Sequence, residues 1–227
     1  MGYPDICNKC VKQKVNVDLF QGNITLKAKP FKGNNPRVML VGQNPTLRVG
    51  EASCVLELNN KKSPIFKFIV DDILKPVGLK LEDTYATNLV KCTFPNNQEP
   101  RYICNKAKKK NIKITVKDFY SPFFRNCSEH FEAEIREIKP KIIISFGVIP
   151  HQLIVEAFSL DVEKAMKKAF SKIYRVNLLG HEAYYAPCIR KKAEVHKVLK
   201  ELLPDFIKNL RATVEKAFGR SSDPDAA

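Results

Sequence analysis

The chain has 227 residues, which is enough to fill one hydrophobic core. Its 44% of hydrophobic residues excludes wholesale disorder, and no apolar run reaches the ~18 residues of a transmembrane helix. A formal charge of +15 and a pI near 9.5 favour a polyanionic partner, nucleic acid rather than a membrane surface, with a generally Lys-rich proteome as the alternative.

The N-terminus has neither a basic-then-apolar signal sequence nor a myristoylation pattern. We therefore expect a cytoplasmic, nucleoid-associated protein. Its seven cysteines are then not expected to form disulfides, and any that cluster are better candidates for metal binding or catalysis.

Predicted strands and helices alternate along the chain. In chain order they are a strand at 37–42, a helix at 63–74, a strand at 84–90, a helix at 129–138, a strand at 141–146, helices at 151–158 and 162–170, strands at 174–179 and 183–185, and a basic helix at 191–218. This alternation predicts the α/β class, as a three-layer α/β/α sandwich with a central, mostly parallel sheet of four to five strands. We expect a single domain over 1–218, with a Lys-rich surface insertion near 105–118 and a disordered tail over 219–227.

Four cysteines form the candidate metal site. Cys7 and Cys10 make a C-x2-C pair, Cys92 follows a predicted strand, and Cys127 is predicted at the start of a helix, where the helix dipole favours a thiolate. Four thiolates hold either an iron–sulfur cluster or structural zinc, and the spacing leaves both open. Ordinary small apolar roles are expected for the others, Cys54, Cys104 and Cys188.

Polar residues follow two of the predicted strands, where α/β sheets bind their ligands. The first strand leads into Gly42, Gln43, Asn44 and Pro45, which lack the GKT or GKS ending of a P-loop. Asn88 lies within the next, otherwise apolar strand, and its amide offers the donor and acceptor that suit a nucleobase edge. The alternatives are a simple polar turn and a core Asn with satisfied hydrogen bonds.

Taken in order, five segments resemble the uracil-DNA glycosylase superfamily, and most closely its iron–sulfur branch, family 4. They are Gly42 to Pro45, Pro64 to Phe66, Thr87 to Cys92, Cys127 to Phe131, and Ile142 to Gly147. The resemblance covers roughly residues 7–199. It implies a monofunctional DNA glycosylase of base excision repair, which flips out uracil or another deaminated base and hydrolyses its N-glycosidic bond.

The resemblance also implies site residues and a cofactor. Asn88 would read the Watson–Crick edge of the flipped base, Phe66 would stack on it, and the loop carrying Gln43 and Asn44 would hold the water and the sugar-phosphate side. The four cysteines Cys7, Cys10, Cys92 and Cys127 would hold a [4Fe–4S] cluster, with zinc as the less favoured alternative. The expected partner is DNA with a damaged base, bound by a monomer, and no membrane.

The sequence departs from family 4 in three places. The interval between Cys92 and Cys127 is longer than usual, which the Lys-rich insertion explains, with Cys104 as a rival ligand. The first motif is Gly-Gln-Asn-Pro in place of Gly-Glu-Ala-Pro-Gly, so we expect Asn44 to position the water, as in the mismatch-specific branch. The second motif has Ala186 where the family has His, and losing such a donor typically costs ~10²–10³ in rate.

The segment after Tyr185 is predicted to face DNA. Ile189 is a candidate wedge for the gap left by a flipped base, and Arg190, Lys191 and Lys192 are candidate phosphate contacts. The alternative is a helix N-terminal turn with solvated charges. Two other functions stay open: a relative that binds DNA or lesions without excision, and a metal-containing nucleic-acid adaptor.

Overall fold

The computed structural model describes residues 25–26, 30–45, 47–48, 51–52, 55–93, 100–109, 111–190 and 201–219. Cys7, Cys10, Cys54, Lys191 and Lys192 lie outside these ranges.

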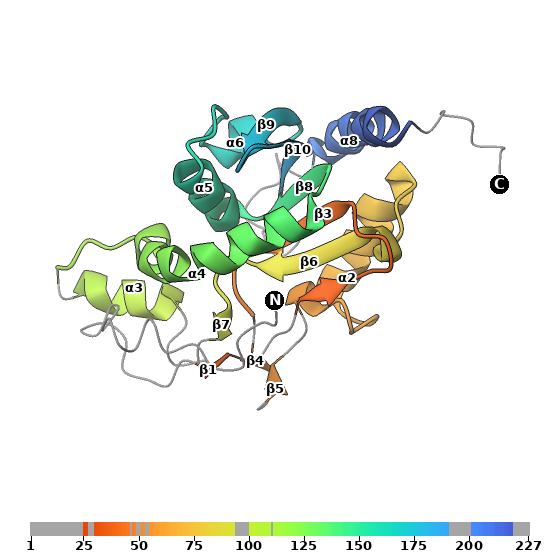
Figure 1. Cartoon of the computed structure of the whole chain (residues 1–227). Coiled ribbons are helices and arrows are strands. Elements are labelled where there is room, and N and C mark those ends of the chain that lie inside the picture. Colours follow the sequence, from red (N-terminus) through yellow and green to blue (C-terminus); the bar gives the residue numbers. More distant parts are fainter. Residues whose placement is uncertain are drawn as a thin grey trace.

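A six-stranded sheet forms the centre of the molecule, in the order β2-β6-β3-β8-β10-β9 (Figure 1). Its strands are β2 (Phe31–Lys32), β3 (Val38–Gly42), β6 (Thr84–Asn88), β8 (Ile142–Phe146), β9 (Tyr174–Leu178) and β10 (His181–Cys188). The four inner strands are parallel, while β2 and β9 pair antiparallel at the edges. The predicted α/β class and mostly parallel sheet are confirmed, and the two-residue β2 brings the sheet to six strands.

Two short ladders lie outside this sheet. β1 (Thr25–Leu26) pairs with β7 (Cys92–Thr93), and β4 (Leu47–Arg48) pairs with β5 (Glu51–Ala52). The first ladder sets Leu26 opposite Cys92, so the chain that follows the N-terminal segment runs beside that cysteine.

Helices cover both faces of the sheet. They are η1 (Val55–Glu57), α2 (Pro64–Lys67), η2 (Phe68–Leu74), η3 (Lys75–Val77), η4 (Leu81–Asp83), α3 (Pro100–Lys109), α4 (Val116–Ile138), α5 (Val148–Ala157), α6 (Met166–Ala169) and α8 (Leu203–Phe218). Strand residues alternate between two cores: Met39 and Val41 pack with α4 and α5, whereas Val38 and Leu40 pack with α2, η2 and α8. The predicted three layers follow from this alternation.

Helix α4 begins earlier than the sequence predicts. Thr115 and Asp118 form a capping box, in which the Thr115 hydroxyl accepts from the Asp118 amide at 3.1 Å and Asp118 accepts from the Thr115 amide at 3.0 Å. The helix then continues through Pro122 to Ile138. Cys127 consequently lies inside the helix, so the prediction that it opens a helix and is favoured by the helix dipole is wrong.

The Lys-rich range near 105–118 comprises the end of α3, a connection and the start of α4. Cys104 of α3 packs in the first core and Ala107 is buried, whereas Lys108 and Lys109 are exposed. This segment is therefore anchored to the core through one face of a helix.

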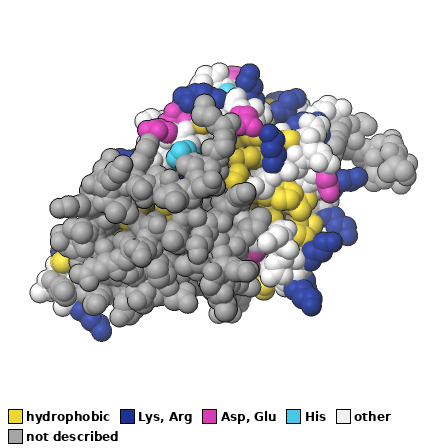
Figure 2. Space-filling view, turned by 60° about the horizontal axis from the view of Figure 1, so that its bottom comes forward, with side chains coloured by type: hydrophobic (Ala, Val, Ile, Leu, Met, Phe, Trp, Pro, Cys, Tyr) yellow, Lys and Arg dark blue, Asp and Glu magenta, His cyan; other side chains and the backbone are white. Residues whose placement is uncertain are grey.

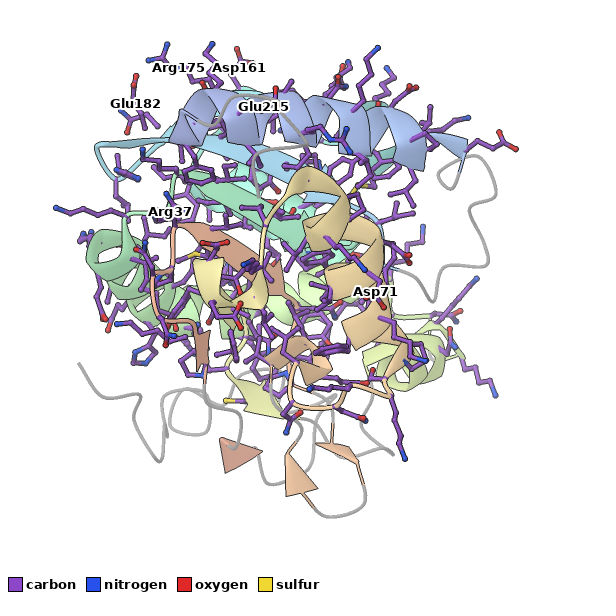
Figure 3. The ribbon with its side chains drawn as sticks, turned by 90° about the vertical axis from the view of Figure 1, so that its right-hand side faces the viewer. Arg37, Asp71, Asp161, Arg175, Glu182 and Glu215 are labelled. Atoms are coloured by element: carbon purple, nitrogen blue, oxygen red, sulfur yellow. The ribbon has the colours of Figure 1, made fainter. Side chains whose placement is uncertain are left out.

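The C-terminal end of α8 is held by two cations. The Arg37 guanidinium lies 4.4 Å from the centre of the Phe218 ring, and Lys141 Nζ lies 5.6 Å from it. Lys141 Nζ also donates to the Ala217 carbonyl at 2.9 Å. Figure 3 shows Arg37 below α8, the helix on which Glu215 is labelled.

Candidate active site

The carboxyl ends of the parallel strands meet in one row. Gly42 of β3 is level with Asn88 of β6, and Phe146 of β8 is level with Cys188 of β10. A pocket with about 350 Å³ of empty space, including the part open to solvent, lies at this row. Its lining residues are Gly42, Gln43, Asn44, Pro45, Leu56, Glu57, Ile65, Asn88, Phe146 and Arg190.

The side-chain amide of Asn88 has a buried N–H donor that makes no hydrogen bond to the described residues. The side chain is 2% exposed, and its Nδ2 has no hydrogen-bond partner among the described residues. A buried amide left unpaired costs about 1–3 kcal/mol, so this donor is better explained by a ligand than by a packing role. A Cβ at Gly42 would lie 2.3 Å from Asn88 Oδ1, so only glycine lets the Asn88 amide take this position.

Asn44 is held in one orientation by two hydrogen bonds. Its Oδ1 accepts from the Tyr120 hydroxyl of α4 at 2.9 Å, and its Nδ2 donates to the Pro45 carbonyl at 2.9 Å. The amide keeps one N–H and one oxygen lone pair for a further partner such as a water. Nothing in the sequence pattern predicts Tyr120, because α4 brings it to the loop from a distant part of the chain.

Two opposite charges line the pocket. Glu57 ends η1, and its Oε2 accepts a hydrogen bond from the Ser63 hydroxyl. Arg190, predicted as a phosphate contact, is partly buried, and its Nε has no hydrogen-bond partner among the described residues. Glu57 is not part of any motif in the sequence, so only the folded chain identifies it as a pocket residue.

Two aromatic residues differ in their relation to the pocket. Phe66, the predicted stacking residue, is partly buried against the second core and is not among the lining residues, although its neighbour Ile65 is. Phe146, at the end of β8, lines the pocket and was not predicted from the sequence.

The second motif lies within a strand rather than in a loop. β10 continues to Cys188, so Ala186 is fully buried in the second core and paired with Ile144. Ile189, predicted to wedge into DNA, is 7% exposed and belongs to the same core, which leaves it unavailable as a wedge in this structure. Burial raises the pKa of the Cys188 thiol, in agreement with an ordinary apolar role.

The two described cysteines of the candidate metal site are both buried. Cys92 is 3% exposed on β7 and Cys127 is 2% exposed on α4, and the ammonium of Lys91 interacts electrostatically with Cys127. No group of three or more potential ligands occurs among the described residues, which do not include Cys7 or Cys10. Two buried thiols, with the Lys91 ammonium acting on Cys127 and with Leu26 of β1 paired to Cys92, fit a thiolate-held metal group.

Lys91 itself is part of a buried polar cluster. Its Nζ donates to Glu134 Oε2 at 2.7 Å and to the Thr87 hydroxyl at 2.6 Å. Burial lowers the pKa of Lys91, and the adjacent Glu134 carboxylate opposes this change. The cluster ties the segment between Asn88 and Cys92 to α4, so the two candidate sites share a rigid support.

Comparison with known proteins agrees with this arrangement. The family model described as the uracil DNA glycosylase superfamily matches residues 30–203. The chain belongs to this superfamily. A type-4 uracil-DNA glycosylase of Saccharolobus solfataricus is 26% identical over 220 residues, covering 93% of this chain and 85% of the relative. One of Archaeoglobus fulgidus is 25% identical over 112 residues, covering 49% and 46%.

These relatives confirm the resemblance to the type-4 branch of the superfamily. Superfamily membership also explains why the pocket lies at the carboxyl ends of parallel strands. Among the described residues, no helix is both long and apolar enough to cross a membrane.

Proposed function

We propose that the protein is a monofunctional DNA glycosylase that flips out uracil or another deaminated base and hydrolyses its N-glycosidic bond in base excision repair. The observation that carries this proposal is the buried, unpaired Nδ2 of Asn88 in the pocket at the strand ends. A base stacked in a duplex is out of reach of such a pocket, so it has to be extruded and then read by hydrogen bonds.

The roles proposed for the pocket amides rest on the position of each group. The Asn88 amide pairs with the edge of the base. The remaining N–H and oxygen lone pair of the Asn44 amide, together with Gln43, hold the attacking water. Phe66 remains the proposed stacking residue on the strength of the family resemblance. Figure 2 shows Lys and Arg side chains around the margin of the face turned forward from the bottom of Figure 1, which agrees with DNA as the partner.

Arg190 takes the role that the missing second-motif His would have. The departing base carries negative charge, and Arg190 is the cation among the described pocket residues. We expect Arg190→Gln to lower the single-turnover excision rate by ~10²-fold. If Arg190→Gln lowered the DNA affinity alone, Arg190 would instead be a phosphate contact. The same phosphate-contact role is proposed for Lys191 and Lys192.

A [4Fe–4S] cluster is proposed for Cys7, Cys10, Cys92 and Cys127. The support is the burial of Cys92 and Cys127, the Lys91 ammonium that acts on Cys127, and the pairing of Leu26 with Cys92. Such a cluster supplies a structural cross-link among these segments. Iron and sulfide analysis with visible absorption of anaerobically purified protein tests it, and a colourless preparation with one zinc per chain would contradict it.

Excision on defined substrates tests the function. Duplex and single-stranded oligonucleotides with one uracil, hypoxanthine or xanthine are incubated with enzyme in excess, then cleaved at abasic sites with alkali. We expect cleavage of at least the uracil substrate, and a loss of ~10²-fold or more in Asn88→Ala, which removes the reading amide. No cleavage of any substrate by the wild-type chain would overturn the proposal.

Ala186 favours a second candidate, a relative that binds lesions without excising them, because it removes the leaving-group donor of the family. Tight binding to a uracil duplex with no turnover would identify this function, and Asn88→Ala should then weaken the binding.

A further inference from the structure

The pocket motifs of this chain contain no carboxylate. This sequence resembles family 4, but family 4 has Glu in the first motif at the position of Gln43. The motif side chains that reach the pocket, Gln43, Asn44 and Asn88, are all neutral amides. Breaking an N-glycosidic bond builds positive charge on the sugar and requires the water to lose a proton, and both are favoured by a carboxylate.

Glu57 brings a carboxylate into the same pocket from a different segment. It ends η1, which packs directly against the end of β3: a Cβ at Gly42 would lie 2.8 Å from Leu56 Cδ2. Glu57 lines the pocket together with Gln43 and Asn44. A carboxylate therefore lines the same pocket as Gln43, which stands where family 4 has Glu.

The backbone at Glu57 is strained, and its side chain is fixed. Leu56 and Glu57 both have left-handed backbones, with φ of 54° and 55°, although neither is glycine. The carboxylate Oε2 accepts from Ser63, a residue that is 1% exposed and also caps α2. Consecutive strained residues persist only where surrounding structure enforces them, and they concentrate at functional sites.

We propose that Glu57 is the catalytic carboxylate of this protein, in place of the first-motif acid of family 4. This inference rests on the proposed glycosylase function. The water held near Asn44 bonds through its oxygen to the sugar C1′, and the C1′–N bond breaks with its electron pair leaving on the base. Glu57 accepts the proton from the water and returns it to solvent, while the base anion takes a proton from solvent.

A purely structural role makes a different prediction. If Glu57 only accepts the Ser63 hydrogen bond that fixes the start of α2, Glu57→Gln keeps an oxygen acceptor of the same shape and should behave like the wild-type chain. If catalysis requires the negative charge of Glu57, the same substitution removes that charge and lowers the excision rate, while the fold stays intact. Glu57→Gln therefore separates the two roles, with thermal unfolding as the check on the fold.

The decisive experiment compares single-turnover uracil excision and DNA affinity in four proteins. They are the wild-type chain, Glu57→Gln, the double variant Glu57→Gln/Gln43→Glu, and Glu82→Gln, an exposed glutamate of η4, as the matched control. We expect Glu57→Gln to lose ~10²-fold or more in rate with unchanged affinity, the double variant to regain rate, and the control to match wild type.

The results distinguish a failure of the role of Glu57 from a failure of the proposed glycosylase function. An active wild-type chain with an equally active Glu57→Gln overturns the role of Glu57 alone. A wild-type chain that excises no base overturns the proposed function, and the role of Glu57 with it.

Discussion

At the scale of single residues, the site depends on side chains whose orientation other residues impose. Asn88 faces the pocket because Gly42 leaves room for its amide, and Asn44 is turned by Tyr120. Gly42 belongs to the first motif, whereas Tyr120 belongs to no motif and comes from α4. The pocket amides are thus prepared in position before a ligand binds, which is what fast hydrolysis requires.

Tyr120→Phe tests this preparation. The substitution keeps the buried ring, which is 2% exposed, but removes the hydrogen bond to Asn44 Oδ1. One neutral hydrogen bond contributes about 0.5–1.5 kcal/mol, so we expect the single-turnover excision rate to fall by up to about tenfold. DNA affinity should stay within about twofold. An unchanged rate would show that Asn44 does not need this partner.

At the scale of elements, the row formed by the ends of β3, β6, β8 and β10 decides which motif positions reach the pocket. The strand β10 continues through Ala186 to Cys188, so Ala186 pairs with Ile144 and faces the second core. A histidine placed there would meet buried apolar side chains rather than the pocket.

Ala186→His is therefore expected to destabilise the protein without raising its activity. Overpacking a full core position typically costs about 1–3 kcal/mol, and burying the imidazole nitrogens adds to this cost. Urea unfolding measures the loss, and excision assays below the unfolding transition measure the rate. A stable variant with faster excision would contradict this placement of the second motif.

A buried side-chain contact also ties the end of β6 to α4. Lys91 and Glu134 form a buried ion pair, with the Nζ of Lys91 2.7 Å from Glu134 Oε2 and the two side chains 2% and 10% exposed. The Thr87 hydroxyl also donates to Glu134, at 3.0 Å. This pair fixes the short segment that carries Asn88 at one end and Cys92 at the other.

Lys91→Met leaves the Glu134 carboxylate buried without its cation, and we expect a loss of about 3–5 kcal/mol in the free energy of unfolding. The double variant Lys91→Met/Glu134→Leu removes both charges and should recover most of the loss. Chemical denaturation of the four proteins of this cycle gives the coupling energy. Additive effects would show that the pair does not stabilise the connection.

At the scale of the whole molecule, buried polar chains tie helices to strands on the face of the sheet that carries the first core. In one of them, His151 Nε2 lies 2.7 Å from the Glu163 carbonyl and must donate to it. The Nδ1 atom of a neutral His151 then accepts from Tyr185, 3.0 Å away, and Tyr185 accepts from Ser145, 2.8 Å away.

Burial lowers the pKa of His151 below its ordinary value of 6.5, because the charged ring would lack water. Below this value the unfolded chain binds a proton that the folded chain does not, so ionisation of His151 increasingly destabilises the fold as pH falls below about 6.5. We expect the loss to reach at most about 1.4 kcal/mol per pH unit.

Urea unfolding between pH 7.5 and pH 5 measures this dependence, with His151→Gln as the reference that subtracts all other titrating groups. The difference between the two proteins should grow toward acid pH in favour of the variant. A constant difference would show that His151 has the same pKa in the folded and the unfolded chain.

The sequence by itself determined five of the six strands of the central sheet, their mostly parallel arrangement, the loop after β3 and the superfamily. Runs such as Val38–Val41 and Ile142–Ile144 specify buried parallel strands locally, and short motifs keep their spacing wherever they fold. It misplaced the start of α4, because the predicted helix at 129–138 left out the upstream apolar face at Phe119 and Phe123 that follows the Thr115 capping box. Only the tertiary structure brought Glu57, Tyr120, Phe146 and Arg190 to the loop of Asn44. The physical reason is that a pocket is made from segments distant in the chain, whose approach depends on packing over the whole sheet rather than on local pattern.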